Sequence, residues 1–108
     1  MLVLGSALVA TAQTSDYPQR PITLITPFPA AGSTDLIART IAQKLGDILG
    51  KPVVVENHAG AGGNIGSNIV AKANPDGYTL LITSSSTHSI GAVLNKSVPF
   101  NYDTDFTP

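Results

Sequence analysis

The sequence has no cysteine among its 108 residues and little charge of either sign. The missing thiols exclude a disulfide framework, a cysteine-ligated zinc site and a thiol nucleophile. Charged residues make up 12% of the chain, the formal net charge is -1, and the six basic residues are dispersed. A nucleic-acid or anionic-membrane surface needs clustered lysine and arginine, so neither partner is predicted. The 43% of hydrophobic residues instead predict a packed globular unit.

The first twelve residues carry no charge, are mostly apolar and end in Ala10-Thr11-Ala12. This pattern is typical of the hydrophobic part and cleavage site of an export signal. The basic start of such a signal is missing, so we expect segment 1–12 to be a remnant of a longer signal peptide. The segment is too short to span a bilayer, which takes about 20 residues. Residues 13–108 would then be the exported part, without direct membrane insertion.

The first strand-to-helix unit starts with an apolar strand from Ile22, ended by Pro27 and Pro29, which cannot donate to a sheet ladder. After the loop, Ser33 or Thr34 is expected to cap a helix. The helix should end at Gly50. Apolar residues at helical spacing predict which face lies on the sheet; they are Ile37, Ile41, Leu45 and Ile48.

Two further units follow the same plan. Val53–Val55 is a β-branched run of the kind buried on both faces of a parallel sheet. The glycine-rich loop 60–63 leads to Asn64, an expected N-cap, and to a helix with an apolar inner side made of Ile65, Ile69, Val70 and Ala73. A third strand, Tyr78–Thr83, precedes a serine-rich loop and a helix through Leu94. Strands that alternate with helices predict an α/β fold with a parallel sheet covered on both sides.

The end of the sequence, residues 105–108, reads as the approach to another strand. We therefore expect 13–108 to be an incomplete first lobe, with a second lobe absent. In open parallel sheets, ligands bind beyond the carboxyl ends of the strands. Those ends carry the loops 28–34, 57–64 and 84–87, and none of the three contains lysine or arginine. Backbone amides and hydroxyl groups are expected to hold an anion there.

Other kinds of site fit the sequence less well. A dinucleotide fingerprint fails because Ile65 stands where its last glycine belongs, and no lysine is present for a P-loop. Neither Ser33 nor Ser67 lies in a G-x-S-x-G elbow. His58 and His88 lack a third metal ligand and are interpreted as exposed loop residues. A small α/β enzyme, hydrolytic or nucleotide-dependent, is the alternative to a binding protein, and a purely structural fragment is the third hypothesis.

Several motifs in fixed order carry a resemblance to a known family. They are Tyr17-Pro18, Pro21-Ile22, Pro27 through Asp35, Val53 through Asn57, Gly60 through Gly66 and Pro75 through Leu80. Together they resemble the Bug-type receptors of tripartite tricarboxylate transporters, from about Tyr17 to Pro108. One departure is Ala31, which stands where a glycine is common.

The resemblance implies a partial lobe of a type II periplasmic binding protein fold. Such a receptor closes around a small carboxylate, an organic acid or amino acid, and delivers it to membrane permease subunits, with no catalysis, cofactor or metal. The loops matching 28–35 and 84–87 touch the ligand in such proteins. Asp35 has a plainer role, compensation of the helix dipole. The expected ligand-binding residues are Phe28, Ala30, Ala31, Gly32, Ser33, Thr34, Asp35, Asn64, Ser84, Ser85 and Thr87.

Overall fold

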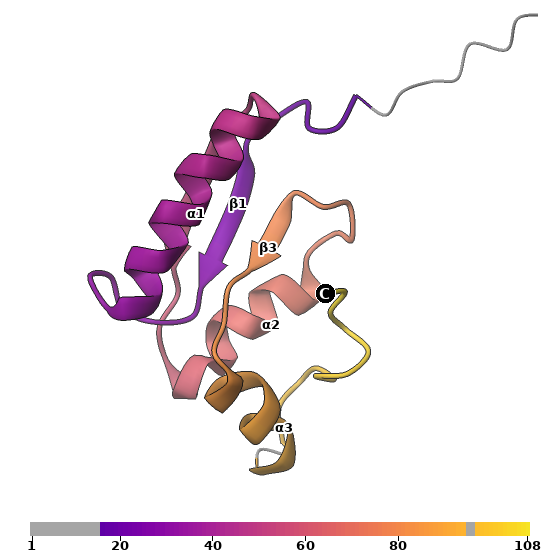
Figure 1. The fold of residues 1–108 in the computed structure, drawn as a ribbon. Coiled ribbons are helices and arrows are strands. Elements are labelled where there is room, and N and C mark those ends of the chain that lie inside the picture. Colours follow the sequence, from indigo (N-terminus) through magenta and orange to yellow (C-terminus); the bar gives the residue numbers. More distant parts are fainter. Residues whose placement is uncertain (1–15, 95–96) are drawn as a thin grey trace, which may run out of the picture.

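The computed structural model describes residues 16–94 and 97–108, which form an α/β unit (Figure 1). Three strands, β1 (Ile22–Thr26), β2 (Val53–Asn57) and β3 (Thr79–Leu81), make one parallel sheet in the order β2-β1-β3. The predicted parallel sheet is therefore confirmed. β3 is shorter than the expected strand, since its ladder with β1 ends where the Ile82 amide donates to the Ile25 carbonyl over 3.0 Å. The expected export segment 1–12 lies outside the described residues.

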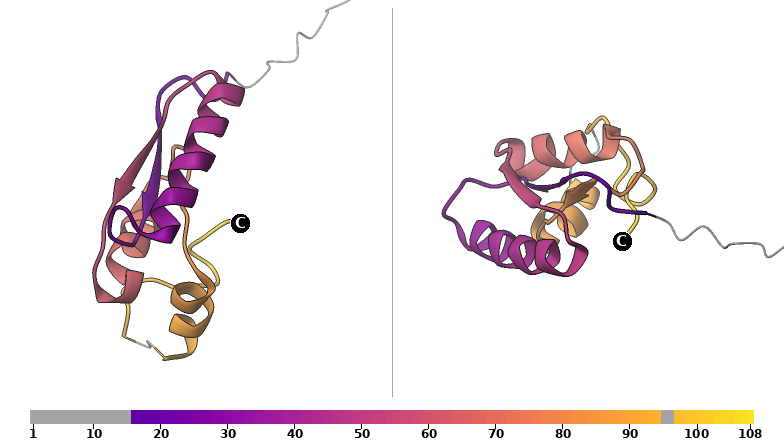
Figure 2. Two further views of the ribbon diagram at one scale, coloured as in Figure 1. Left: turned by 60° about the vertical axis from the view of Figure 1, so that its left-hand side comes forward. Right: turned by 90° about the horizontal axis from the view of Figure 1, so that it is seen from above.

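Helices cover both faces of the sheet (Figure 2). α1 (Ser33–Leu49) packs against β1 and β2, and α2 (Asn64–Lys72) packs against β1 and β3 from the other side. A 3-10 turn, η1 (Ala61–Gly63), precedes α2, and a π-helical turn, η2 (Ser86–Ile90), runs directly into α3 (Gly91–Leu94). Because each helix follows a parallel strand, all strand-to-helix loops lie at the same edge of the sheet.

Helix α1 is bounded by glycines at both ends. Its N-cap is Gly32, and no side chain caps the helix, so the predicted capping by Ser33 or Thr34 is wrong. The predicted stop at Gly50 is confirmed: this residue has φ 74°, in the left-handed region, and its amide donates to the Gly46 carbonyl over 2.9 Å.

The face of α1 that lies on the sheet is formed by small residues. Ala38 and Ala42 are buried against Leu24 of β1, and the apolar residues around them are Val53, Val55, Leu80 and Ile82. The predicted face is wrong, because Ile37, Ile41 and Ile48 are exposed. Consecutive residues are rotated by about 100° around a helix, and the alanine side lets the helix approach the sheet closely.

Enlarging an alanine of this face is expected to destabilise the fold. Ala42→Leu adds carbon atoms at a buried position, and overpacking of this kind costs about 1–3 kcal/mol in the free energy of unfolding. Ile48→Ala is the control, because its side chain is 74% exposed and a surface change should stay within about 0.5 kcal/mol. Urea denaturation of both variants measures the difference. Equal losses in the two variants would show that the isoleucine side is the packed one.

Strand β2 is not buried on both faces as predicted. Val53 and Val55 point towards α1, whereas Val54 is 48% exposed on the other face. The reason is topological: β2 is one of the two edge strands among the described residues, and α2 packs over β1 and β3 rather than over β2.

The inner side of α2 also differs from the prediction. Gly66 and Ser67 are buried, whereas Ile65 and Ile69 are exposed. The N-cap is Gly63, so the predicted capping by Asn64 is wrong. The Ser67 hydroxyl donates to the Gly63 carbonyl over 2.8 Å, inside the first turn. Small residues face the sheet here as they do in α1, and they bring the start of α2 close to the loop after β1.

The described residues 97–108 form turns and contain no strand, and the expected approach to a further strand stays a prediction. Phe100 and Tyr102 are buried there and pack edge-to-face with each other. His88 of η2 contacts the rings of Tyr102 and Phe106, and its Nε2 lies 3.2 Å from the Tyr102 carbonyl. The interpretation of His88 as an exposed loop residue is therefore wrong. The segment is held by an aromatic cluster rather than by a sheet ladder.

Candidate functional site

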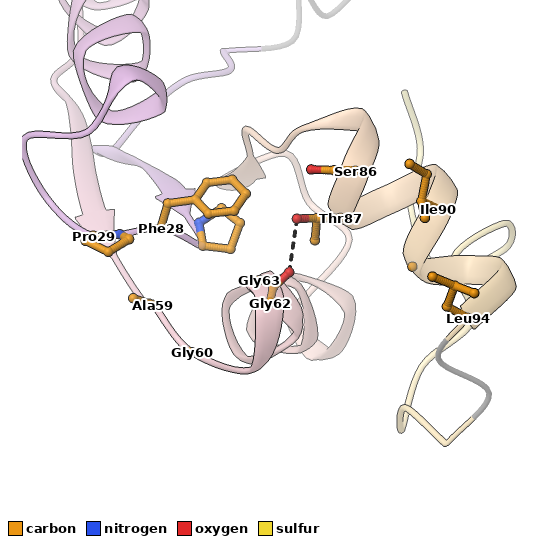
Figure 3. A pocket seen from close by; sticks show the side chains of 12 residues that line it. Phe28, Pro29, Ala59, Gly60, Gly62, Gly63, Ser86, Thr87, Ile90 and Leu94 are labelled. Carbon is orange, nitrogen blue, oxygen red and sulfur yellow. Dashed lines mark hydrogen bonds between the residues drawn. The ribbon is translucent and has the colours of Figure 1, made fainter.

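The three strand-to-helix loops line an open cavity of about 510 Å³ at the carboxyl edge of the sheet (Figure 3). The loop after β1 contributes one wall, the glycine-rich loop after β2 the floor, and η2 with α3 the opposite wall. The lining residues are Pro27, Phe28, Pro29, Ala59, Gly60, Gly62, Gly63, Ser86, Thr87, Ile90, Gly91 and Leu94. None of them carries a charge. The polar groups on offer are backbone amides and carbonyls and two hydroxyls.

The predicted site residues divide into three groups. Phe28 and Thr87 line this cavity. A second hollow, of about 420 Å³, lies on the loop after β1 and is lined by Phe28, Pro29, Ala30, Ala31, Gly32, Ser33 and Thr34. Asp35, Asn64, Ser84 and Ser85 line neither. Asn64 accepts a hydrogen bond from the Tyr102 hydroxyl, and the Ser84 hydroxyl lies 2.8 Å from that of Ser86.

The sequence placed the glycine-rich floor, loop 57–64, at this edge by topology, although only Asn64 of this loop was named as a binding residue. The outer wall was missed. On the outer wall, Ile90 and Leu94 are four residues apart and so share one side of a helix. Which way that side faces depends on how η2 leaves the sheet, and the local sequence does not carry this information.

The Thr87 side chain connects η2 to the glycine-rich loop after β2 and so fixes the two loops relative to each other. Its side chain is buried, and its hydroxyl donates to the Gly62 carbonyl over 3.0 Å. Gly63 has φ 96°, and a Cβ added there would lie 2.5 Å from Cγ2 of Thr87. Glycine is thus required at this position both by the backbone conformation and by the close approach of the threonine. The floor of the cavity and the wall formed by η2 are thereby held at a fixed spacing.

Removing the Thr87 hydroxyl is expected to loosen this connection. Thr87→Val keeps the shape of the side chain but deletes the bond to Gly62, with an expected cost of about 1 kcal/mol in unfolding free energy. The control is Ser86→Ala, since the exposed Ser86 hydroxyl bonds only its neighbour Ser84 among the described residues. Denaturant titration with amide exchange at Gly62 and Gly63 measures the effect. Unchanged exchange in Thr87→Val would contradict this connection.

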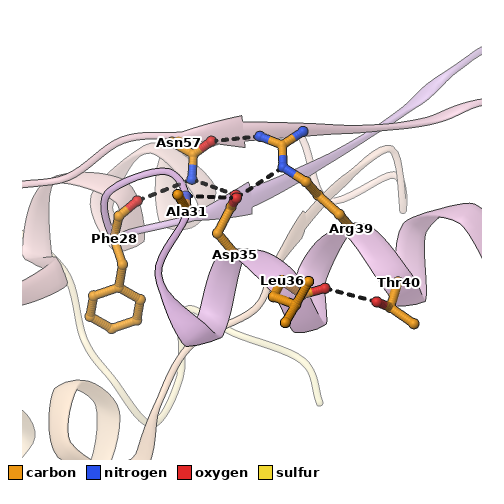
Figure 4. A network of polar contacts seen from close by, with 7 residues as sticks. All are labelled: Phe28, Ala31, Asp35, Leu36, Arg39, Thr40 and Asn57. Atoms are coloured by element: carbon orange, nitrogen blue, oxygen red, sulfur yellow. Dashed lines mark hydrogen bonds and ion pairs between the residues drawn. The ribbon is translucent and has the colours of Figure 1, made fainter.

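A polar network holds the loop after β1 (Figure 4). The buried Asp35 accepts hydrogen bonds from the Ala31 amide at 3.0 Å and from Arg39 Nε at 2.9 Å, both at Oδ2. Its Oδ1 accepts from Asn57 Nδ2 at 2.8 Å. Asn57 Nδ2 also reaches the Phe28 carbonyl at 3.2 Å, and Asn57 Oδ1 accepts from the Arg39 guanidinium at 3.1 Å. Residues at the end of β2 and in the first turn of α1 thereby hold the loop after β1 by hydrogen bonds at both of its ends.

The network fixes Asp35 in its charged form. The hydrogen bond from Arg39 lowers the pKa of this carboxyl most, followed by those from Asn57 and Ala31, and brings it from 3.8 to about 2. Both carboxylate oxygens have partners within the protein. Ala31 has φ 66°, a left-handed conformation that is unfavourable for a residue with a Cβ. The network therefore stabilises a strained loop conformation. This role of Asp35 goes beyond the predicted compensation of the helix dipole.

The described part of the chain shows neither metal ligation nor a membrane span. In residues 16–94 and 97–108, no three histidine or acidic side chains gather as a metal site would require. Within the same ranges, no helix has the length and apolar character needed to cross a bilayer.

Comparison with a protein family gives a match over most of the chain. The family is the tripartite tricarboxylate transporter family receptor, and the match covers residues 37–108. Among curated proteins, the chain is 46% identical over 109 residues to Protein BugT of Bordetella pertussis. That alignment covers 100% of this chain and 33% of BugT, so the chain spans about a third of the length of such relatives.

Solved structures of periplasmic binding proteins have the same fold over the shared region. BugD is 42% identical, with a TM-score of 0.78 over 85% of this chain and 30% of that one. MatC from Rhodopseudomonas palustris, with bound malate, is 39% identical, with a TM-score of 0.80 over 85% and 31%. An R. palustris protein solved with adipate is 39% identical, with a TM-score of 0.81 over 86% and 31%.

These relatives are receptors and not enzymes, which removes the hydrolase and nucleotide-dependent alternatives. Since the family match covers more than half of the sequence and the relatives include Bug proteins, this chain belongs to the tripartite tricarboxylate transporter receptor family.

Proposed function

We propose that this chain supplies one wall of a periplasmic receptor that binds a small carboxylate for uptake through tripartite tricarboxylate-type permease subunits. The observation that carries the proposal is the uncharged cavity where three strand-to-helix loops meet. Its backbone amides and hydroxyls suit an anion that must later be released, because they grip it without a strong ion pair. The relatives solved with malate and adipate support the same ligand class.

The first residues of two longer helices add to this support. α1 and α2 begin at Ser33 and Asn64, next to the loops that line the hollows. The first amides of a helix have no intrahelical acceptor, and the helix dipole makes this end electropositive. A carboxylate bound at this edge is therefore stabilised without lysine or arginine. Export to the periplasm and delivery to a permease follow from the family and from the apolar segment 1–12, and both are part of the proposal.

Isothermal titration of the chain with adipate and malate tests this function. We expect saturable binding without consumption of the acid. Adipamide, which has the same length but no charge, is the matched control and should bind at least roughly tenfold more weakly, because the amide dipoles act on the anionic charge. The absence of saturable binding and of any ligand-dependent thermal shift would reject binding of the acid by this wall and leave a structural fragment.

A further inference from the structure

The outer wall of the cavity is apolar and open to solvent. Ile90 is 54% exposed and Leu94 is 73% exposed, and both line the cavity from η2 and α3. Figure 3 shows the two side chains on the continuous segment of η2 and α3, beyond Ser86 and Thr87. Val93, which is 70% exposed on the same helix, does not line the cavity. The outer part of the cavity is therefore lined by the apolar side chains of Ile90 and Leu94, and its centre is polar.

The opposite wall has the same character. Phe28 and Pro29 form it, from the loop after β1. Between the two apolar walls lie the hydroxyls of Ser86 and Thr87 and the backbone of the glycine-rich floor. The polar groups thus lie between two apolar walls.

Among the described residues that line the cavity, none is a cation that could pair with a second or third carboxylate. Arg39 is committed to Asp35 and Asn57. Arg20 pairs with Asp76 at 3.0 Å, among the residues that precede β1 and β3 and so at the opposite edge of the sheet. Each extra carboxylate taken into the cavity would lose hydration without gaining an ion pair, and this weakens its binding.

We propose that this cavity prefers a carboxylate with an apolar body over a polyanion: the polar groups between the two walls take the single charged group, and Ile90 and Leu94 cover the hydrocarbon. This inference rests on the proposed function and narrows its ligand class. Each methylene buried against the wall should raise affinity roughly fourfold.

Titrations with hexanoate, adipate and citrate test the preference, because these acids have the same number of carbon atoms and differ in their number of carboxylates. The expected order of affinity is hexanoate first and citrate last, with a ratio of roughly tenfold or more, since citrate has few buried methylenes to offer. Equal binding of the three acids, or tighter binding of citrate, would overturn the inference and leave the proposed function intact. If none of the three binds saturably, the proposed function itself fails.

Variants of Ile90 and Leu94 distinguish a direct contact with the ligand from an indirect effect on the conformation of η2 and α3. The double variant Ile90→Ser with Leu94→Ser should weaken hexanoate roughly tenfold and leave citrate unchanged, since only the hydrocarbon loses its partner. Val93→Ser is the matched control at similar exposure and should change neither. Equal losses for hexanoate and citrate, or an equal loss in Val93→Ser, would overturn the contact. The order of the three acids on the unaltered chain decides the preference even where a variant does not fold.

Discussion

Asp35→Asn is expected to weaken carboxylate binding roughly tenfold although the side chain lines neither hollow. Asparagine keeps the shape but replaces one acceptor with a donor, which then faces either the donors of Ala31 and Arg39 or that of Asn57. The strained conformation at Ala31 then loses its main support. A loop that adopts the binding geometry only a tenth of the time lowers the apparent affinity by the same factor. Titration calorimetry with adipate measures the loss.

The matched control is Asp47→Asn on the same helix, where the carboxylate is exposed. It makes the same chemical change away from the loop and should leave affinity unaltered. A positioning role also predicts that Asp35→Asn weakens malate and adipate by the same factor, because the residue acts through the loop. Unequal losses for the two acids would indicate a direct contact of Asp35 with the ligand.

The same variant should change how stability depends on pH. The pKa of Asp35 in the folded chain is about 2, below its ordinary value of 3.8. A lowered pKa means that the charged network stabilises the fold fully above 3.8, and that this stabilisation is lost as the pH falls towards 2. Asparagine does not titrate. The difference in melting temperature between the two proteins should therefore be largest near neutral pH and shrink in acid; a constant difference would contradict the network.

Gly66→Ala is expected to cause a large loss of stability. A Cβ at this position would lie 2.7 Å from Cβ and 2.8 Å from Cα of Pro27, and 2.9 Å from the His58 carbonyl oxygen. These atoms belong to the loops after β1 and β2 and are mostly backbone, so the loops themselves must move apart. Overpacking of this kind costs about 1–3 kcal/mol or more, which corresponds to roughly 4–8 °C in melting temperature per kcal/mol for a domain of this size.

Gly32→Ala is the matched control for this loss. Its φ is −78°, and the nearest atom to an added Cβ is the Pro29 carbonyl oxygen at 3.5 Å, an ordinary contact. The control should therefore lose about 0.5–1 kcal/mol, the difference between alanine and glycine at an N-cap, and less than Gly66→Ala. Thermal unfolding of both variants measures the two losses. Similar melting temperatures would show that α2 does not pack closely against Pro27 in the loop after β1.

The sequence predicted the elements better than their packing, and α1 shows why. Its length follows from local signals, the prolines and the glycine that bound it. Its orientation does not, because the side that meets the sheet combines the polar Asp35 with two alanines. That choice depends on the bond from Asp35 to Asn57 on another strand, a contact between residues distant in sequence. Apolar periodicity marks the isoleucine side instead.

The site shows the same division. The parallel topology was enough to place Phe28 and Thr87 at a common edge, because the ends of parallel strands carry the loops. Asp35, Asn64, Ser84 and Ser85 lie beside the cavity without lining it. Whether such a residue touches a ligand or supports the loops depends on the direction of its side chain. The turn at η2 and the network around Asn57 set these directions, and both form only when the loops have come together.

Mapping ligand-induced shifts of the backbone amide resonances is the most direct test of the central claim, that the three loops bind one carboxylate together. On titration of the isotope-labelled chain with adipate, we predict saturable shifts at Phe28, in the floor from Gly60 to Gly63, and at Ser86 and Thr87, all with one dissociation constant. Shifts confined to the opposite edge, around Arg20 and Tyr78, or separate constants for the three loops, would contradict a shared site.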